Sequence, residues 1–199
     1  MALITAAQAR LYIRGLSGTA EDSNISTLVA RVDAMFASYL GYPVRSDGTY
    51  TVEDSTYVLY LDGDGTKELQ LPVIPVVSVT SIYDDPELDY GSDDLVASGD
   101  YTLYGDSGLV ILKNASTQGE WSATKRAIKA TIVAGWATIP VAVQHAASLQ
   151  VSHLWTGRDH VGRSKISQGG GAMDVARIEL LPEVKRALDP YRVASAWLG

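Results

Sequence analysis

The 199-residue chain contains no cysteine, which excludes both a disulfide framework and a thiolate metal site. It also lacks a long apolar run, since no segment approaches the roughly 18 apolar residues that a membrane span needs. The start of the chain, from Met1 to Thr5, has neither the basic nor the apolar region of a signal peptide. We therefore expect a protein made in the cytoplasm, with no membrane contact, whose stability comes from packing.

Positive charge is also scarce. The chain has 16 Lys and Arg against 23 Asp and Glu, a formal net charge of −7. This balance argues against a surface that grips nucleic-acid phosphates. It still allows a wall along which DNA slides.

Helical patterns occupy both ends of the chain. Thr5 and Gln8 have the spacing of a capping box, which predicts a helix that runs to about Gly15. Apolar residues then recur at helical spacing over 23–40. After Gly135-Trp136, helical spacing returns over 140–155, and a short helix is predicted over 180–188.

Between these helices the apolar period changes to two, which predicts strands. Turn residues separate the strands, and we expect the segments 62–65 and 105–108 to close hairpins. A run of acidic residues over 84–94 is interpreted as a solvated loop that could also face a channel. The predicted strands are 57–61, 68–71, 76–83, 100–104, 109–113 and 127–134.

These patterns predict an α+β fold, in which a small helical bundle core carries an inserted antiparallel β-sheet or sandwich. Residues 1–50 and 136–160 form the helical core, and residues 51–135 form the inserted β domain. Residues 161–199 form a flexible loop with three consecutive glycines, a short helix and a C-terminal tail.

Motifs that suggest chemistry fail on spacing or on missing partners. The Gly-Asp-Ser-Gly run at 105–108 resembles the surroundings of a nucleophilic serine, but the three histidines, His145, His153 and His160, all follow it. The Asp-Gly-Asp-Gly run at 62–65 lacks the carboxylate that a calcium loop needs at its twelfth position, which is Val73. We expect no catalytic residue, no cofactor and no metal, so the chain is not predicted to be an enzyme.

Five patches, in order along the chain, resemble the head-to-tail connector (adaptor, or head completion) family of long-tailed bacteriophages and gene transfer agents. Each is weak alone, but together they span almost the whole sequence. They are Leu-Ile-Thr at 3–5, Leu-Gly-Tyr-Pro at 40–43, Leu-Pro-Val-Ile-Pro-Val-Val-Ser-Val at 71–79, Val-Ala-Gly-Trp-Ala-Thr-Ile-Pro at 133–140, and Leu-Leu-Pro-Glu-Val with Leu-Asp-Pro-Tyr-Arg over 180–192.

The resemblance implies a virion structural protein of the particle neck, assembled in the host cytoplasm. Its subunits would form a homo-oligomeric ring, commonly of about twelve copies, between the portal protein and a tail, stopper or tail-terminator protein. DNA would pass through the channel without sequence-specific binding. Family members without a sheet insertion exist, so the role of the β portion is the open part of this prediction.

Two sets of residues are candidates for these contacts. A short helix is unstable alone in water, so its apolar side needs either the chain's own core or another protein. The candidates for portal docking are Leu181, Val184, Leu188, Tyr191, Trp197 and Leu198. The candidates for packing in the ring are Leu28, Val32, Phe36 and Leu149.

A second interpretation of the sequence is that the chain is a binding module. The β portion could be a sandwich that binds carbohydrate or protein, with the helices as accessories. Tyrosines in its strands would form the binding surface, and they are Tyr57, Tyr60, Tyr83, Tyr90, Tyr101 and Tyr104.

Overall fold

The computed structural model describes residues 3–45, 47–158, 165–168, 171–174 and 179–192. The chain divides into two compact units. The helical unit comprises residues 1–36 and 139–192, and the β unit comprises residues 37–138 together with the C-terminal residues 193–199. The domain boundaries expected from the sequence, at 51 and 135, lie inside the range of the β unit.

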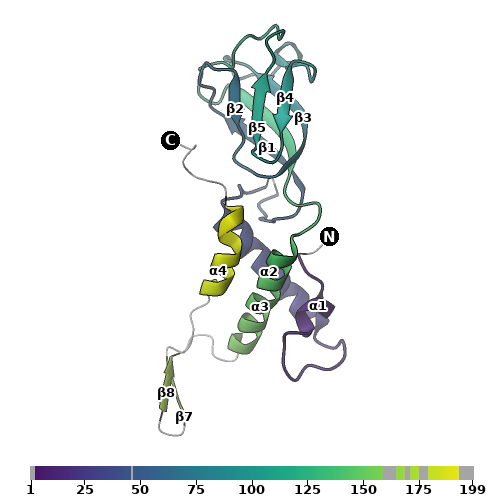
Figure 1. Cartoon of the computed structure of the whole chain (residues 1–199), viewed down its shortest axis with the longest axis vertical. Coiled ribbons are helices and arrows are strands. Elements are labelled where there is room, and N and C mark those ends of the chain that lie inside the picture. Colours follow the sequence, from purple (N-terminus) through teal and green to yellow (C-terminus); the bar gives the residue numbers. More distant parts are fainter. Residues whose placement is uncertain (1–2, 46, 159–164, 169–170, 175–178, 193–199) are drawn as a thin grey trace. The chain divides into compact units, whose positions relative to one another are not determined.

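Four α-helices build the described part of the helical unit: α1 (Ala6–Arg10), α2 (Asp22–Leu40), α3 (Val141–Gly157) and α4 (Pro182–Leu188) (Figure 1). A 3-10 turn, η3 (Asp189–Tyr191), follows α4. The last residues of α2 belong to the β unit. No helix in the described part of the chain is both long and apolar enough to cross a membrane.

The capping box predicted at the start of α1 is confirmed. The Gln8 N–H donates to the Thr5 hydroxyl at 3.2 Å, and the Thr5 N–H donates to the Gln8 side chain at 2.7 Å. The helix is shorter than predicted, because after Arg10 the backbone turns through tighter bonds such as Tyr12 N–H to Ala9 O.

The core of the helical unit is mostly apolar, with Ser148 and Gln150 of α3 as its buried polar side chains among the described residues. Helices α3 and α1 contact one another, as do α3 and α4. The buried residues come from all four helices and the first loops: Leu3, Ile4, Ala9, Ile13, Ile25, Val29, Val32, Phe36, Val143, Ala146, Ala147, Val151, Trp155, Val184 and Leu188.

Six strands build the β unit within its described residues, 37–45 and 47–138: β1 (Ser55–Leu61), β2 (Glu68–Gln70), β3 (Val76–Asp84), β4 (Tyr101–Tyr104), β5 (Leu109–Leu112) and β6 (Ile128–Ala134). All six predicted strands are present. They pair in two antiparallel three-stranded sheets, with the orders β1-β6-β3 and β2-β5-β4. In Figure 1 the strands of the second sheet overlie those of the first.

The two sheets bury alternate residues, as expected for strands with one face in a core. In β6 the residues Ile128, Ala130, Ile132 and Ala134 are buried, while those between them are half-buried. In β5 the buried residues are Val110 and Leu112, and the two residues between and before them are half-buried. The Val76 N–H donates to Gly105 O at 2.7 Å, which ties the start of β3 to the β4–β5 turn.

The two turn predictions have different outcomes. Residues 105–108 close the β4–β5 hairpin, in which Tyr104 faces Leu109, so that prediction is confirmed. The prediction for residues 62–65 is wrong, because β1 pairs with β6 whereas β2 pairs with β5. The Asp-Gly-Asp-Gly segment therefore passes from one sheet to the other, and Asp64 stabilises it by accepting from Thr66.

The glycine-rich stretch also differs from the prediction of a flexible loop. Strands β7 (Lys165–Gln168) and β8 (Gly171–Asp174) form an antiparallel pair within it. Gly171, expected to belong to the flexible loop, faces Gln168 in that ladder. Glycine weakens a strand but does not prevent one.

Candidate functional site

The short helix α4 is held in place by apolar packing and by one buried amide. Val184 and Leu188 have no exposed surface, and α4 contacts α3. The side chain of Gln150 on α3 is also fully buried. It donates to Glu179 O at 3.0 Å and accepts from the Leu181 N–H at 3.0 Å. These contacts fix the start of α4 against the bundle.

The docking candidates therefore fall into three groups. Val184 and Leu188 lie in the chain's own core, so a partner reaches them only if α4 leaves α3. Leu181 and Tyr191 are partly exposed at the two ends of the α4–η3 segment. Trp197 and Leu198 lie outside the described residues.

The ring-packing candidates lie on α2 and α3. Val32 and Phe36 are fully buried in the subunit, whereas Leu28 and Leu149 keep part of their surface exposed. More strongly exposed apolar side chains occur nearby in the chain, namely Leu11 and Val141, which keep 84% and 80% of their surface in solvent. Pattern reasoning missed both, because neither belongs to the periodic apolar stripe of a helix.

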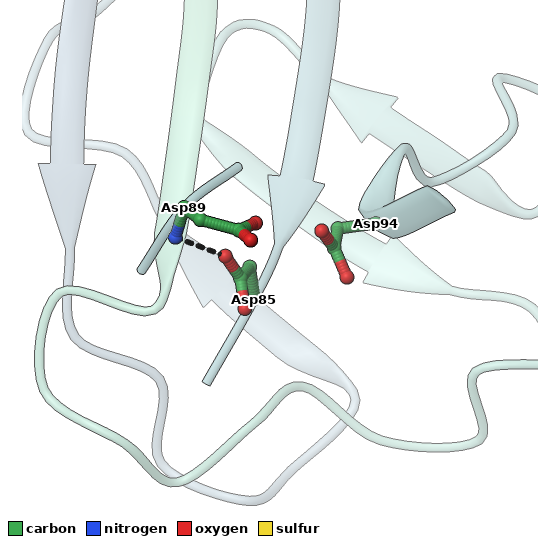
Figure 2. A group of neighbouring side chains, drawn as sticks. All are labelled: Asp85, Asp89 and Asp94. Atoms are coloured by element: carbon green, nitrogen blue, oxygen red, sulfur yellow. Dashed lines mark hydrogen bonds between the residues drawn. The ribbon is translucent and has the colours of Figure 1, made fainter. Parts of the chain in front are cut away.

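The acidic segment after β3 forms the only group of potential metal ligands among the described residues. Carboxylate oxygens of Asp85, Asp89 and Asp94 lie within 4.8 Å of one another (Figure 2). Asp85 is buried, and its oxygens accept three backbone N–H bonds, from Glu87 at 2.7 Å, Asp89 at 2.5 Å and Tyr90 at 2.6 Å. This carboxylate therefore organises its own loop.

Two carboxyl groups of this loop, Asp85 and Asp94, have pKa values shifted in opposite directions. The hydrogen bond from Tyr90 N–H, with those from the other two amides, holds the pKa of Asp85 below its usual value. Loss of hydration, together with the charges of Asp85 and Asp89, raises the pKa of Asp94. A carboxylate that caps a loop explains the arrangement without a bound ion.

A second buried carboxylate belongs to Asp84, at the end of β3. It accepts from the Gln118 side chain at 2.5 Å and from the Ser122 N–H at 2.9 Å. Its other oxygen is buried without a hydrogen bond to the described residues. Burial raises the pKa of Asp84 above the usual value.

The remaining candidates for chemistry are structural where the structure describes them. The Ser107 hydroxyl donates to Tyr104 O at 3.2 Å inside the hairpin turn. The ring of His145 hydrogen-bonds to the Tyr12 hydroxyl at 3.0 Å. His160 lies outside the described residues.

The sequence matches the family model for head completion proteins over residues 2–194. No sequence of a curated protein matches the chain significantly. Similar solved structures include a chain in the neck of an empty gene transfer agent particle computed with sixfold symmetry, with a TM-score of 0.63 and 16% identity. The alignment covers 99% of this chain and 93% of that one.

Two further structures are similar at 17% identity. One chain belongs to the virion of a native gene transfer agent, with a TM-score of 0.60 and coverage of 99% of this chain and 93% of that one. The other belongs to the neck of a native particle computed with twelvefold symmetry, with a TM-score of 0.54 and coverage of 98% and 91%. At this identity, the likeness shows that the fold is shared along nearly the whole length of both chains.

Proposed function

The chain belongs to the head completion protein family, and from that premise we propose that it is a structural subunit of the neck of a phage-like particle. Its role is to join the DNA-filled head to the tail. The observation that carries the proposal is the extent of the match, which covers residues 2–194 and therefore both the helical unit and the β unit. An adaptor needs surfaces for its neighbours, and it needs no catalytic group.

We propose that the subunits form a ring around the DNA channel, with about twelve copies. The similar chains come from necks computed with sixfold and twelvefold symmetry, which supports a ring of this order. Leu28 and Leu149, which stay partly exposed, are the two ring-packing candidates that a neighbour can reach without unfolding the subunit. Val32 and Phe36 support the contact from inside the core.

The partners on the two sides of the ring are a portal protein and a tail, stopper or tail-terminator protein. We assign portal docking to the segment that begins just before α4 and continues to the last residues, with Leu181, Tyr191, Trp197 and Leu198 as contact residues. The packing of Val184 and Leu188 supports this assignment, because it anchors α4 and gives the following segment a fixed starting point.

Charge supports passage of DNA without binding. The β unit has 6 Lys and Arg against 15 Asp and Glu, a net charge of −9, whereas the helical unit has 10 against 8, a net charge of +2. The chain as a whole therefore carries a net charge of −7, and a negative chain does not grip the phosphates of passing DNA.

The alternative, a carbohydrate-binding sandwich, has less support. Tyr57 and Tyr101 are buried and offer no stacking surface. The rings of Tyr60, Tyr83 and Tyr90 already hold the side chains of Arg126 or Lys129. A sugar would have to displace these cations before it could stack.

Removal of the last seven residues, 193–199, tests the docking assignment in particles whose own copy of the gene has been deleted. We expect the truncated subunit to fold, because α4 is retained, and heads and tails to accumulate unjoined. A subunit of full length with a Gly-Ser sequence over 193–199 separates the effect of sequence from that of length. Normal joining by both variants would contradict docking through this segment, and a neck without this protein in electron micrographs would contradict the function.

A further inference from the structure

A group of three tyrosines and two cations lies at one end of the outer face of the sheet β1-β6-β3. We call it the tyrosine–cation patch, and it comprises Tyr60, Tyr83, Tyr90, Arg126 and Lys129. The register places Lys129 between Tyr60 and Tyr83 on neighbouring strands. The Arg126 guanidinium lies 5.1 Å from the centre of the Tyr60 ring. The Lys129 ammonium lies 5.6 Å and 5.2 Å from the Tyr83 and Tyr90 rings.

The patch is held in a fixed conformation. Tyr90 and Arg126 both have positive φ, at 53° and 58°, which costs energy for residues other than glycine. Three hydrogen bonds maintain this backbone: Tyr90 hydroxyl to Arg126 O at 2.7 Å, Arg126 N–H to the Asp62 side chain at 2.8 Å, and Tyr90 N–H to the Asp85 side chain at 2.6 Å. A prearranged group of Tyr and Arg is typical of residues that dominate protein interfaces.

The two cations keep their charge available to a partner. Among the described residues, ion pairs form between Arg10 and Asp22 and between Arg45 and Asp47, and neither involves the patch. Arg126 is exposed, and Lys129 and Tyr60 are partly exposed, Tyr60 by 43%. Arg126 and Lys129 make this patch positive, whereas the β unit as a whole has a net charge of −9. The patch can therefore attract the negative surface of the β unit in another copy.

A closed ring of identical subunits requires two different surfaces on each copy, because one side of a subunit meets the other side of the next. The outer face of the sheet β2-β5-β4 is the second large strand surface of the β unit. It carries Glu68, which is exposed, and Tyr104, which keeps 49% of its surface in solvent. Glu68 forms no ion pair among the described residues.

We propose that the tyrosine–cation patch of one subunit contacts the Glu68 face of the β unit in the neighbouring copy. The occupant of the patch is thus a second copy of this chain, and the contact gives the inserted β unit a role in closing the ring. This inference rests on the proposed ring function. A carboxylate facing Arg126 and Lys129 matches the charge of the patch, and Tyr104 adds apolar contact at its edge while the cations stay on the tyrosine rings.

A charge exchange tests the contact in particles supplied with the variant subunit. We expect Lys129→Glu and Glu68→Lys each to lower the yield of joined particles at least about tenfold, because each places like charges together. The double variant should restore most of the yield. Arg14→Glu is the control, because Arg14 is an exposed cation of the helical unit and belongs to neither of the two proposed faces. Thermal unfolding checks that each variant is folded.

A cross-link keeps the proposal falsifiable if a charge variant fails to fold. A photoreactive phenylalanine at Val58, which is 43% exposed on the same outer face, is placed in the otherwise unchanged chain. We expect a dimer of this chain whose cross-linked peptide contains Glu68 or Tyr104. The proposal would be overturned by an adduct with another protein, with DNA or with a different peptide of this chain, and equally by the absence of any adduct. It would also be overturned if the double variant failed to restore the yield of joined particles. A ring in the neck that persists under those results would leave the proposed function intact.

Discussion

Replacement of Gln150 by leucine is expected to release α4 from the bundle. The Gln150 side chain is fully buried and makes two hydrogen bonds to the backbone just before α4. Leucine keeps the apolar packing on α3 but makes neither bond. Each lost bond costs about 0.5–1.5 kcal/mol. Because Glu179 is exposed and water can reach its carbonyl group, we expect a total of about 1–2 kcal/mol.

The effect should be local as well as global. A loss of 1–2 kcal/mol corresponds to a roughly 5–30-fold shift in the opening equilibrium, so amide exchange of Lys185, Arg186 and Ala187 in α4 should accelerate by that factor. The midpoint of thermal unfolding should fall by about 2–8 °C for a chain of this size. Hydrogen exchange followed by mass spectrometry reports the first effect, and calorimetry the second.

Gln144→Leu is the matched control on the same helix. Gln144, in the first turn of α3, donates to Ile139 O at 2.8 Å and accepts from the Gln8 side chain at 3.4 Å. This variant removes two bonds of the same kind, neither of which involves α4, so exchange in α4 should stay at the wild-type rate. Equal exchange in α4 for the Gln150 variant and the wild type would refute the role assigned to this amide.

Four further substitutions test the fold. At Gly135, with φ of 114°, a Cβ would overlap Glu53 O, so Gly135→Ala should lower the free energy of unfolding by at least about 2 kcal/mol. At Gly157 a Cβ meets open space, so Gly157→Ala should raise the free energy of unfolding by up to about 1 kcal/mol. Chemical denaturation measures both changes, and an alanine at 135 that leaves stability unchanged would contradict the clash. Thr5→Ala removes the capping box and should cost about 1 kcal/mol by the same assay, with no change if the cap is not formed. Burial raises the pKa of Asp84 in the folded state above its unfolded value, so the wild type loses stability as pH rises from the unfolded pKa through the folded pKa. The free energy of unfolding of Asp84→Asn relative to wild type should therefore be greater near pH 7 than near pH 3. A difference that does not change with pH would contradict this.

The elements of this fold follow closely from local signals in the sequence. Period-two patterns with β-branched residues located all six strands of the β unit, and the Thr5–Gln8 spacing located a cap that the structure contains. Strand pairing did not follow, because pairing depends on contacts between distant residues. The Asp-Gly-Asp-Gly segment at 62–65 has good turn residues but connects strands of different sheets.

The candidate surfaces were less predictable than the elements. An apolar stripe such as that of Leu28, Val32 and Phe36 indicates burial, but it does not distinguish the subunit's own core from a neighbour. The buried amide of Gln150 and the cation contacts at Arg126 had no local signal, since each depends on a residue far away in the chain. Val184 illustrates the same limit, because the pattern correctly showed that it needs a partner and could not show that the partner is α3.

The six strands of the β unit lie in one continuous stretch of the chain, whereas the helical unit is built from two separate stretches. This division sets the order in which the two units can be completed during synthesis. All the strands of the β unit lie between Ser55 and Ala134, so its two sheets can assemble as soon as that continuous stretch has left the ribosome. The helical unit needs Ile25 from early in the chain and Leu188 from near its end in one core. This core cannot be completed before Leu188 has been synthesised, so the nascent subunit can carry finished sheets while its helical core is still incomplete.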